Sequence, residues 1–284
     1  GETAQYTESV AIGHLAGFTH QNTYSVAIGT CAGETGQYTE SVAVGWRAGN
    51  GAQGQNSVSV GAEAGYISQN NYSVAVGSDA GKTAQALGAI AVGFSSGNSA
   101  QGVSGVGIGY RAGQTTQGLH GIAVGHESGQ TTQGAGGIGI GSLAGNDSQG
   151  IQGIAIGFEA GKTSQNTYAI AIGTDAGETG QYTNSVAIGY QAGRLNQHQN
   201  SVAIGYEAGE VTQNNYCVAI GSGTGKTAQY DESTAIGRAA GQTAQGTRSV
   251  ALGYYAATTS QGGNSVAIGG EAGKTSQGTH AVAI

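Results

Sequence analysis

Proline and methionine are absent from this 284-residue chain, which also contains only two cysteines and one tryptophan. Charged residues make up 9% of the sequence, too few for a charge-rich disordered segment. Collagen is excluded, because its helix needs proline and a glycine at every third position, and the 56 glycines do not follow that spacing. Another regular structure must therefore order this glycine-rich chain.

Long hydrophobic runs and clusters of positive charge are also missing. The apolar runs reach only about four residues, whereas a helix that crosses a bilayer needs roughly 20. The nine Lys and Arg residues are scattered along a chain with a net charge of -7, so there is no basic stripe to bind phosphates. We expect no nucleic acid partner and no membrane insertion in this segment. Because the sequence shows no signal-peptide pattern and starts and stops within a repeat, we interpret it as an excerpt from a longer fibre protein.

A sixteen-residue unit fills the chain. If Ser185 is the first position of "SVAIGYQAGRLNQHQN", the unit begins at Ser9 and recurs without insertion or deletion to Ala281. Residues at the same position of successive units are called a column below. The second and fourth columns carry Val, Ile or Leu except at Thr234, and the fifth is Gly. We predict a single repeat array over residues 1–284.

The spacing within a unit predicts β-structure. Val and Ile at the second and fourth positions alternate with small residues, which is the period of a strand, and glycines then interrupt the pattern. A sixteen-residue period is too short for a helix pair or a propeller blade, but it suits one coil of a solenoid with two short strands. We therefore predict an all-β parallel β-solenoid of about 18 coils, stacked about 4.8 Å apart.

The thirteenth column is glutamine throughout, and stacked amides can hydrogen-bond from coil to coil. The eleventh column is mostly Thr but contains Ile67, Leu195 and Val211, which indicates a site that is at least half inside. We predict that the second, fourth, eleventh and thirteenth positions face the interior of the coil. The predicted structural ladder consists of Gln5, Gln21, Gln37, Gln53, Gln69, Gln85, Gln101, Gln117, Gln133, Gln149, Gln165, Gln181, Gln197, Gln213, Gln229, Gln245, Gln261 and Gln277.

The first, third and fifth columns hold only small residues. A face in contact with water would carry bulky and charged side chains, as the sixth and seventh positions do at Trp46 and Arg47. Two explanations remain open. Either a second copy of the array packs on the small face, which predicts a symmetric oligomer, or the coil is flat and needs small residues on an internal face.

The segments "NSVAIGYQAG" and "SVAIGYEAG" resemble the head repeats of YadA-like trimeric autotransporter adhesins, and related tandem repeats occur in fibre proteins of phages and large DNA viruses. The resemblance covers the whole chain, although the unit here is slightly longer than the usual adhesin-head unit. It implies a left-handed β-roll, a homotrimer, and an extracellular location on a cell or virion surface. It also implies a structural and adhesive fibre, whose partners are further copies of the chain and a host-surface protein or glycan.

Residues for catalysis or metal binding are not evident. The "GKT" segments, such as 157–163, have one residue too few between their glycines for a phosphate-binding loop. The six His residues occupy different columns or distant coils, so stacking forms no metal site, and no Ser has an orienting His. We predict no enzyme, no catalytic residue, no metal and no cofactor.

Tyrosines recur at outer positions. Tyr190 and Tyr206 follow one another in the sixth column, while Tyr38, Tyr182 and Tyr230 share the fourteenth. Such rings suit exposed strand edges without any ligand, or they contact a glycan or a host surface. We keep these five residues as candidate surface contacts.

The two cysteines, Cys31 and Cys217, lie twelve coils apart, too far to bridge within one straight array. Cys217 occupies the small first column, where a bridge between symmetry copies is the alternative to a packed replacement for Ser. In the tenth column, charges alternate in sign on successive coils, at Lys162, Glu178, Arg194, Glu210 and Lys226.

An ice-binding solenoid is the alternative function, because the eleventh column places Thr at regular intervals on a flat stack. Thr forms a single rank, however, and aliphatic residues interrupt it. The column is also predicted to point inward, where it could not contact ice.

Overall fold

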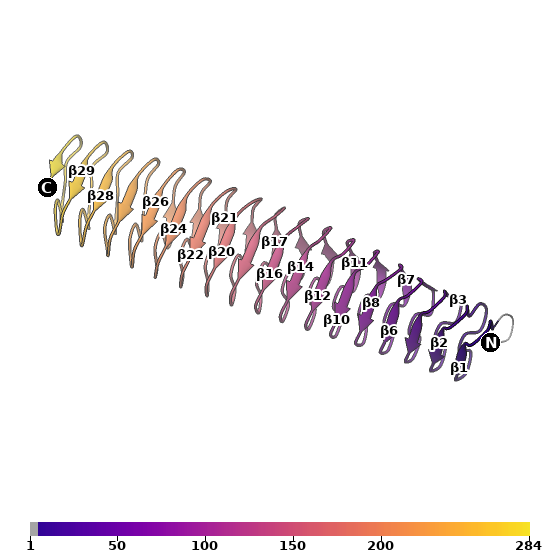
Figure 1. Ribbon diagram of the computed structural model, residues 1–284. Coiled ribbons are helices and arrows are strands. Elements are labelled where there is room, and N and C mark those ends of the chain that lie inside the picture. Colours follow the sequence, from indigo (N-terminus) through magenta and orange to yellow (C-terminus); the bar gives the residue numbers. More distant parts are fainter. Residues whose placement is uncertain (1–4) are drawn as a thin grey trace. The chain divides into compact units, whose positions relative to one another are not determined.

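The computed structural model describes residues 5–284, and within that range every regular element is a β-strand. The chain divides into two compact units, residues 1–146 and 147–284. In each unit, the coils contribute Val/Ile strands to one parallel sheet, the VI sheet, and glutamine-containing strands to a second, the Gln sheet (Figure 1). The predicted all-β parallel β-solenoid with sixteen-residue coils is confirmed. That residues 1–284 form one array stays a prediction.

The first unit contains nine strands of the VI sheet and seven of the Gln sheet within its described residues. Those of the VI sheet are β1 (Val10–Ile12), β2 (Val26–Ile28), β4 (Val42–Val44), β6 (Val58–Val60), β8 (Val74–Val76), β10 (Ile90–Val92), β12 (Val106–Ile108), β14 (Ile122–Val124) and β16 (Ile138–Ile140). Those of the Gln sheet are β3 (Gly36–Gln37), β5 (Ala52–Gln53), β7 (Ile67–Gln69), β9 (Thr83–Gln85), β11 (Ser99–Gln101), β13 (Thr116–Gln117) and β15 (Thr132–Gln133).

The second unit is built in the same way. Its VI sheet contains β18 (Ile154–Ile156), β20 (Ile170–Ile172), β22 (Val186–Ile188), β24 (Val202–Ile204), β26 (Val218–Ile220), β27 (Thr234–Ile236), β28 (Val250–Leu252), β29 (Val266–Ile268) and β30 (Val282–Ala283). Its Gln sheet contains β17 (Asp147–Gln149), β19 (Thr163–Gln165), β21 (Thr179–Gln181), β23 (Leu195–Gln197) and β25 (Val211–Gln213). Beyond Gln213 the Gln sheet continues as isolated parallel bridges between successive glutamines as far as Gln277.

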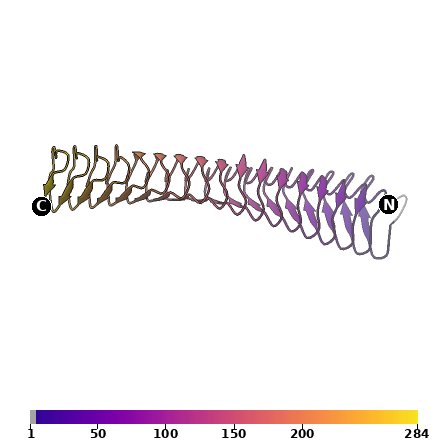
Figure 2. The ribbon, with the colours of Figure 1, turned by 90° about the horizontal axis from the view of Figure 1, so that it is seen from above.

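Each residue pairs with the residue one repeat further along the chain. In β22 and β24, for example, Val186 lies opposite Val202 and Ile188 opposite Ile204. The backbone N–H of Val186 donates to the carbonyl of Ser201 at 2.9 Å, and the same type of bond recurs coil after coil. Figure 2 shows the strands following one another in this way within each unit. Like residues therefore stack in columns, as the repeat predicts.

The interior of the coil contains small residues, which corrects the predicted orientation of the VI strands. The third-column alanines, such as Ala187 and Ala203, are fully buried, as are first-column Ser185 and eighth-column Ala192. Val and Ile of the second and fourth columns point outward instead. The coil is flat, and the space between its two sheets is filled by the methyl groups and hydroxyls of small residues, by Thr224 and by the glutamine side chains. The hypothesis that a second copy packs on the small face is therefore wrong.

The eleventh column also differs from the prediction, since its residues lie on the outside. Thr35 is exposed, and its hydroxyl donates to the carbonyl of Asn50 at 2.8 Å. Thr259 likewise donates to the carbonyl of Lys274 at 2.9 Å. These threonines join neighbouring coils from the outer surface.

The thirteenth-column glutamines are the largest buried side chains. Nε2 of Gln197 donates across the interior to the carbonyl of Val186 at 2.8 Å, and therefore connects the Gln sheet to the VI sheet. The same nitrogen lies 3.0 Å from Oε1 of Gln213 in the next coil. Amide-to-amide bonds of this kind also join Gln69 to Gln85, among others, but Oε1 of Gln37 has no partner among the described residues.

Glycine is required at two points of the coil. Gly189 in the fifth column has a φ of 128°, and a Cβ there would lie 2.5 Å from the carbonyl oxygen of Gly205. Gly193 in the ninth column has a φ of 53°, and a Cβ would lie 2.7 Å from Oε1 of Gln197. Side chains are therefore disfavoured at these points by the left-handed backbone and by the close approach of the next coil or of the buried amide.

Candidate interaction surfaces

The outer side of the VI sheet is an apolar face in each unit. Second-column residues are half-buried in most coils, and many of the fourth column are exposed. Ile108 and Ile140 are each 40% exposed in the first unit, and Leu252 is 41% exposed in the second. Monomeric proteins rarely leave a continuous apolar surface of this kind open to water, so this face is a candidate interaction site.

Aromatic rings stack in the sixth column, just beyond the ends of the VI strands. The ring centroids of Tyr190 and Tyr206 lie 5.2 Å apart, in line with their spacing in the sequence. A second stack joins Phe94 to Tyr110 at 5.4 Å and Tyr110 to His126 at 5.1 Å. Sequence reasoning missed this second stack, although the sixteen-residue spacing of the three rings could have revealed it.

The fourteenth-column tyrosines lie at the opposite end of the coil, so the five predicted contact residues do not form one site. Tyr38 is 52% exposed and Tyr230 is 49% exposed. Tyr182 is partly covered, because His198 of the next coil packs on it with ring centroids 4.9 Å apart. The coils that follow Tyr38 and Tyr230 carry Gly54 and Gly246 at that position instead.

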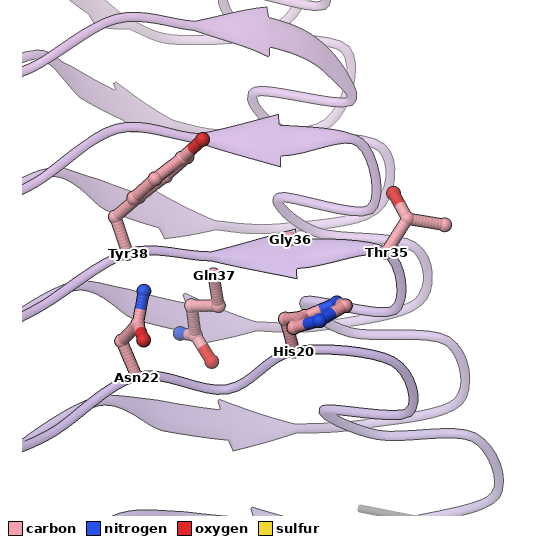
Figure 3. A pocket seen from close by; sticks show the side chains of 6 residues that line it. All are labelled: His20, Asn22, Thr35, Gly36, Gln37 and Tyr38. Atoms are coloured by element: carbon pink, nitrogen blue, oxygen red, sulfur yellow. The ribbon is translucent and has the colours of Figure 1, made fainter. Parts of the chain in front are cut away.

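Shallow cavities adjoin these two open rings on the outer side of the Gln sheet. One, of about 300 Å³, is lined by His20, Asn22, Thr35, Gly36, Gln37 and Tyr38. In Figure 3, Tyr38 and Asn22 lie at one end of it and His20 and Thr35 at the other. Gly36 leaves the strand between them bare, and the amide of Gln37 is buried.

Two further cavities repeat this construction. The first, of about 330 Å³, lies beside Tyr38 over Ala52, Gly54 and Ser68. The second, of about 370 Å³, lies in the other unit beside Tyr230, over a floor that includes Ala244, Gly246, Ser260, Gly262 and Ser276. In both, small residues at the twelfth position and glycine at the fourteenth leave a hollow beside the ring. The cavities at Tyr38 and Tyr230 are called the tyrosine troughs below.

Charged side chains gather at the turn between the two sheets, in the seventh and tenth columns. Lys226 donates to Glu207 and lies 3.3 Å from Glu210. Its hydrogen bond raises the pKa of Lys226 and lowers the pKa of Glu207. Arg194 lies 3.6 Å from Glu210, so part of the alternating tenth column forms ion pairs.

Two seventh-column carboxylates on neighbouring coils, Asp175 and Glu159, have separate partners. Asp175 accepts a hydrogen bond from Gln191 at 3.3 Å, and Glu159 pairs with Lys162 at 3.0 Å. Residues 5–284 contain no group of three or more His, Cys, Asp or Glu side chains that could hold a metal ion.

Both cysteines are free. Cys217 is fully buried inside the coil, where its thiol donates to the carbonyl of Tyr230 at 2.9 Å and burial raises its pKa. The hypothesis of a bridge between copies at Cys217 is therefore wrong for this folded coil. Cys31 is half-buried at a turn.

Comparison with known families agrees with the coil geometry. Residues 231–256 and 244–272 match two copies of the YadA head domain repeat. The chain contains YadA-like head repeats. Both matched segments include a complete Val/Ile strand, the outward face of which is described above. No curated protein matches the chain.

The YadA head family is a structural and adhesive family of surface-exposed proteins, not a family of enzymes. Together with the parallel solenoid, the match indicates an adhesin-like structural fibre. Among residues 5–284, no helix is long and apolar enough to cross a membrane.

Proposed function

We propose that the chain is the stiff, self-associating head or shaft of an extracellular fibre that attaches to a surface. The observation that carries the proposal is the outward Val/Ile face. Transferring such a face from water into a contact with another copy is favourable by about 25 cal/mol per Å² of apolar surface. Because the coils present the same two columns, copies related by a rotation axis can match coil by coil within each unit.

A homotrimer is the assembly that the YadA-like repeats favour. Three copies would place their VI sheets around a common axis, leaving the Gln sheets and their tyrosine troughs on the outside for contact with a host protein or glycan. In this arrangement, the VI sheet of each coil contacts the other copies and the Gln sheet contacts the host surface. It suits an extracellular fibre on a cell or virion.

The molar mass of the purified chain in solution tests self-association. Light scattering with and without reductant should give three times the chain mass of 27.8 kDa in both cases. Ile188→Glu combined with Ile204→Glu places charges on the outward face and should yield monomers. The matched control is Thr179→Glu with Thr227→Glu, at exposed positions of the eleventh column. A monomeric wild-type chain, or oligomers that survive the Ile substitutions, would contradict the proposal.

We assign the mechanical stiffness of the fibre to the glutamine column. Each buried amide of the type seen at Gln197 bonds the opposite sheet of its own coil and the glutamine of the next coil. Pulling two coils apart would therefore break side-chain bonds in addition to the backbone ladder. Among the described residues, Oε1 lacks a partner at Gln21, Gln37 and Gln53 in successive coils, and also at Gln117 and Gln261. The longest weak stretch of this ladder therefore lies in the first coils.

The structure provides one observation in favour of the alternative function, ice binding, and one observation from the sequence still argues against it. The eleventh-column threonines lie on the outside, contrary to the prediction, so they could meet an ice surface. Their rank remains single, and Ile67, Leu195 and Val211 interrupt it. Measurement of thermal hysteresis decides the question, and we expect none.

A further inference from the structure

The tyrosine troughs have the same construction in both units, although their residues are far apart in the sequence. In each, an exposed ring stands beside a floor of small twelfth-column residues and fourteenth-column glycine. The glycine floor leaves no room for a side chain, since a Cβ on Gly54 or Gly246 would lie within 2.5 Å of the next coil's backbone. The floor of the hollow is therefore set by the backbone of the coils, and the exposed tyrosine ring forms one of its walls.

The lining of the troughs is neutral and rich in hydrogen-bonding groups. No Asp, Glu, Lys or Arg lines any of the three cavities, and the lining of the first includes the imidazole of His20. The hydroxyls of Ser68 and Ser260 are exposed and make no hydrogen bond with the described residues. An aromatic face with uncharged donors and acceptors beside it fits a ligand that has one apolar side and many hydroxyl groups.

Other ligand classes fit less well. A charged polymer would find no complementary charge in the lining. An extended peptide that adds a strand needs an open sheet edge, whereas the backbone groups of these coils bond to neighbouring coils within each unit. A pyranose ring meets both requirements, because its C–H face stacks on an aromatic ring while its hydroxyls bond to Ser and Asn.

We propose that the tyrosine troughs at Tyr38 and Tyr230 are binding subsites for a neutral saccharide. This inference rests on the proposed function in surface attachment and names the ligand class. The sugar stacks on the tyrosine ring, and its hydroxyls exchange hydrogen bonds with the serines of the floor. Since coils repeat about every 4.8 Å, a linear chain can continue over the next coil of the trough.

The test uses the full chain and a panel of neutral hexasaccharides of glucose, mannose and N-acetylglucosamine. Binding is read by saturation-transfer NMR and by calorimetry. At least one member of the panel should bind, and Tyr38→Ala with Tyr230→Ala should weaken that binding about tenfold or more. The matched control is Tyr168→Ala, which removes an equally exposed ring of 53% that lines none of these cavities.

Three outcomes would overturn the saccharide assignment. They are no binding by any hexasaccharide, equal loss of binding in the Tyr168→Ala control, and tyrosine-dependent binding of an extended peptide probe without any sugar binding. Light scattering on the same samples separates the two proposals. A trimer that binds no sugar would support the proposed fibre and contradict the saccharide site. A monomer that binds sugar would support the saccharide site and contradict the proposed fibre.

Discussion

The two sheets of each coil use the alternation of a strand in opposite ways. In the VI sheet, the larger residues lie outside and alanine and serine lie inside. In the Gln sheet, the inward residue is the largest buried side chain and the outward ones are mostly polar. The inner face of one sheet is thus flat and apolar, while the inner face of the other supplies amides that cross the gap. The two faces fit each other, because small residues on one side make room for glutamine on the other.

This difference explains why the outside of the coil has two characters. The VI sheet presents Val and Ile to its surroundings because the interior has no room for them. The Gln sheet presents Thr, Ser and Tyr on its outer side, because its large residue, the thirteenth-column glutamine, points inward and forms internal hydrogen bonds. An apolar outer face and a polar outer face therefore follow from the same packing constraint.

The largest expected effect comes from placing a bulky side chain on the wrong side of a VI strand. Ala187→Leu should destabilise the fold by about 1 to 3 kcal/mol or more, because the fully buried alanine faces the opposite sheet. Val186→Leu, one residue earlier on the outward face, should change stability by less than about 0.5 kcal/mol. Urea unfolding followed by circular dichroism compares the two. The reverse order of effects would mean that the faces are assigned the wrong way round.

The second prediction removes the amide that joins the two sheets. Gln197→Leu should destabilise by about 1 to 3 kcal/mol, because it removes the amide that donates to the buried Oε1 of Gln213 at 3.0 Å. Gln199→Leu changes an exposed glutamine of the same coil and should have little effect. Hydrogen exchange at the amides of β22 and β24 gives a local measure. Equal protection in both variants would remove the case for the glutamine column as a structural ladder.

The repeat and its register could be predicted from the sequence, but the orientation of the VI strand could not. An unbroken period places Val186 opposite Val202 whatever the coil looks like. Alternation, however, allows either set of side chains to face inward, and a one-residue change of register exchanges the two faces. The usual rule that Val and Ile fill cores fails here because the coil is too flat to contain them.

The candidate sites were predictable to a similar extent. Stacking of Tyr190 on Tyr206 follows from their shared column. The tyrosine troughs depend on what neighbouring coils lack, such as a side chain at Gly54 or Gly246, and on the direction of an exposed ring. The identity of the residues in one column does not predict the cavity that neighbouring coils leave beside the ring.

The third prediction concerns the one ninth-column residue that is not glycine among the complete coils. Ala257 has a φ of 48°, a conformation that costs a non-glycine residue about 1 to 2 kcal/mol. Its neighbour Gln261 also has an Oε1 without a partner. Ala257→Gly should therefore raise the free energy of unfolding by about 1 kcal/mol. The converse change, Gly209→Ala, should lower it, since the added Cβ would lie 3.0 Å from Oε1 of Gln213. Thermal unfolding midpoints that move in the same direction for both variants would contradict this reasoning.

The smallest expected effect lies in the ion pairs at the turns. Because Lys226 lowers the pKa of Glu207, the pair stabilises the fold above the ordinary carboxyl pKa of 4.5, and this contribution is lost as the pH falls through the lower folded value. The pKa of Lys226 is raised, so its own contribution is present below 10.5 and is lost as the pH rises through the higher folded value. Both side chains are partly solvated, at 33% and 20% exposure, which limits the effect to less than about 1 kcal/mol. Glu207→Gln should lower the unfolding midpoint slightly at pH 7 and leave it unchanged near pH 3.

Glu232→Gln, in a more exposed pair with Arg248, should change neither midpoint. A loss at pH 3 as large as that at pH 7 would show that Glu207 acts through packing and not through its charge.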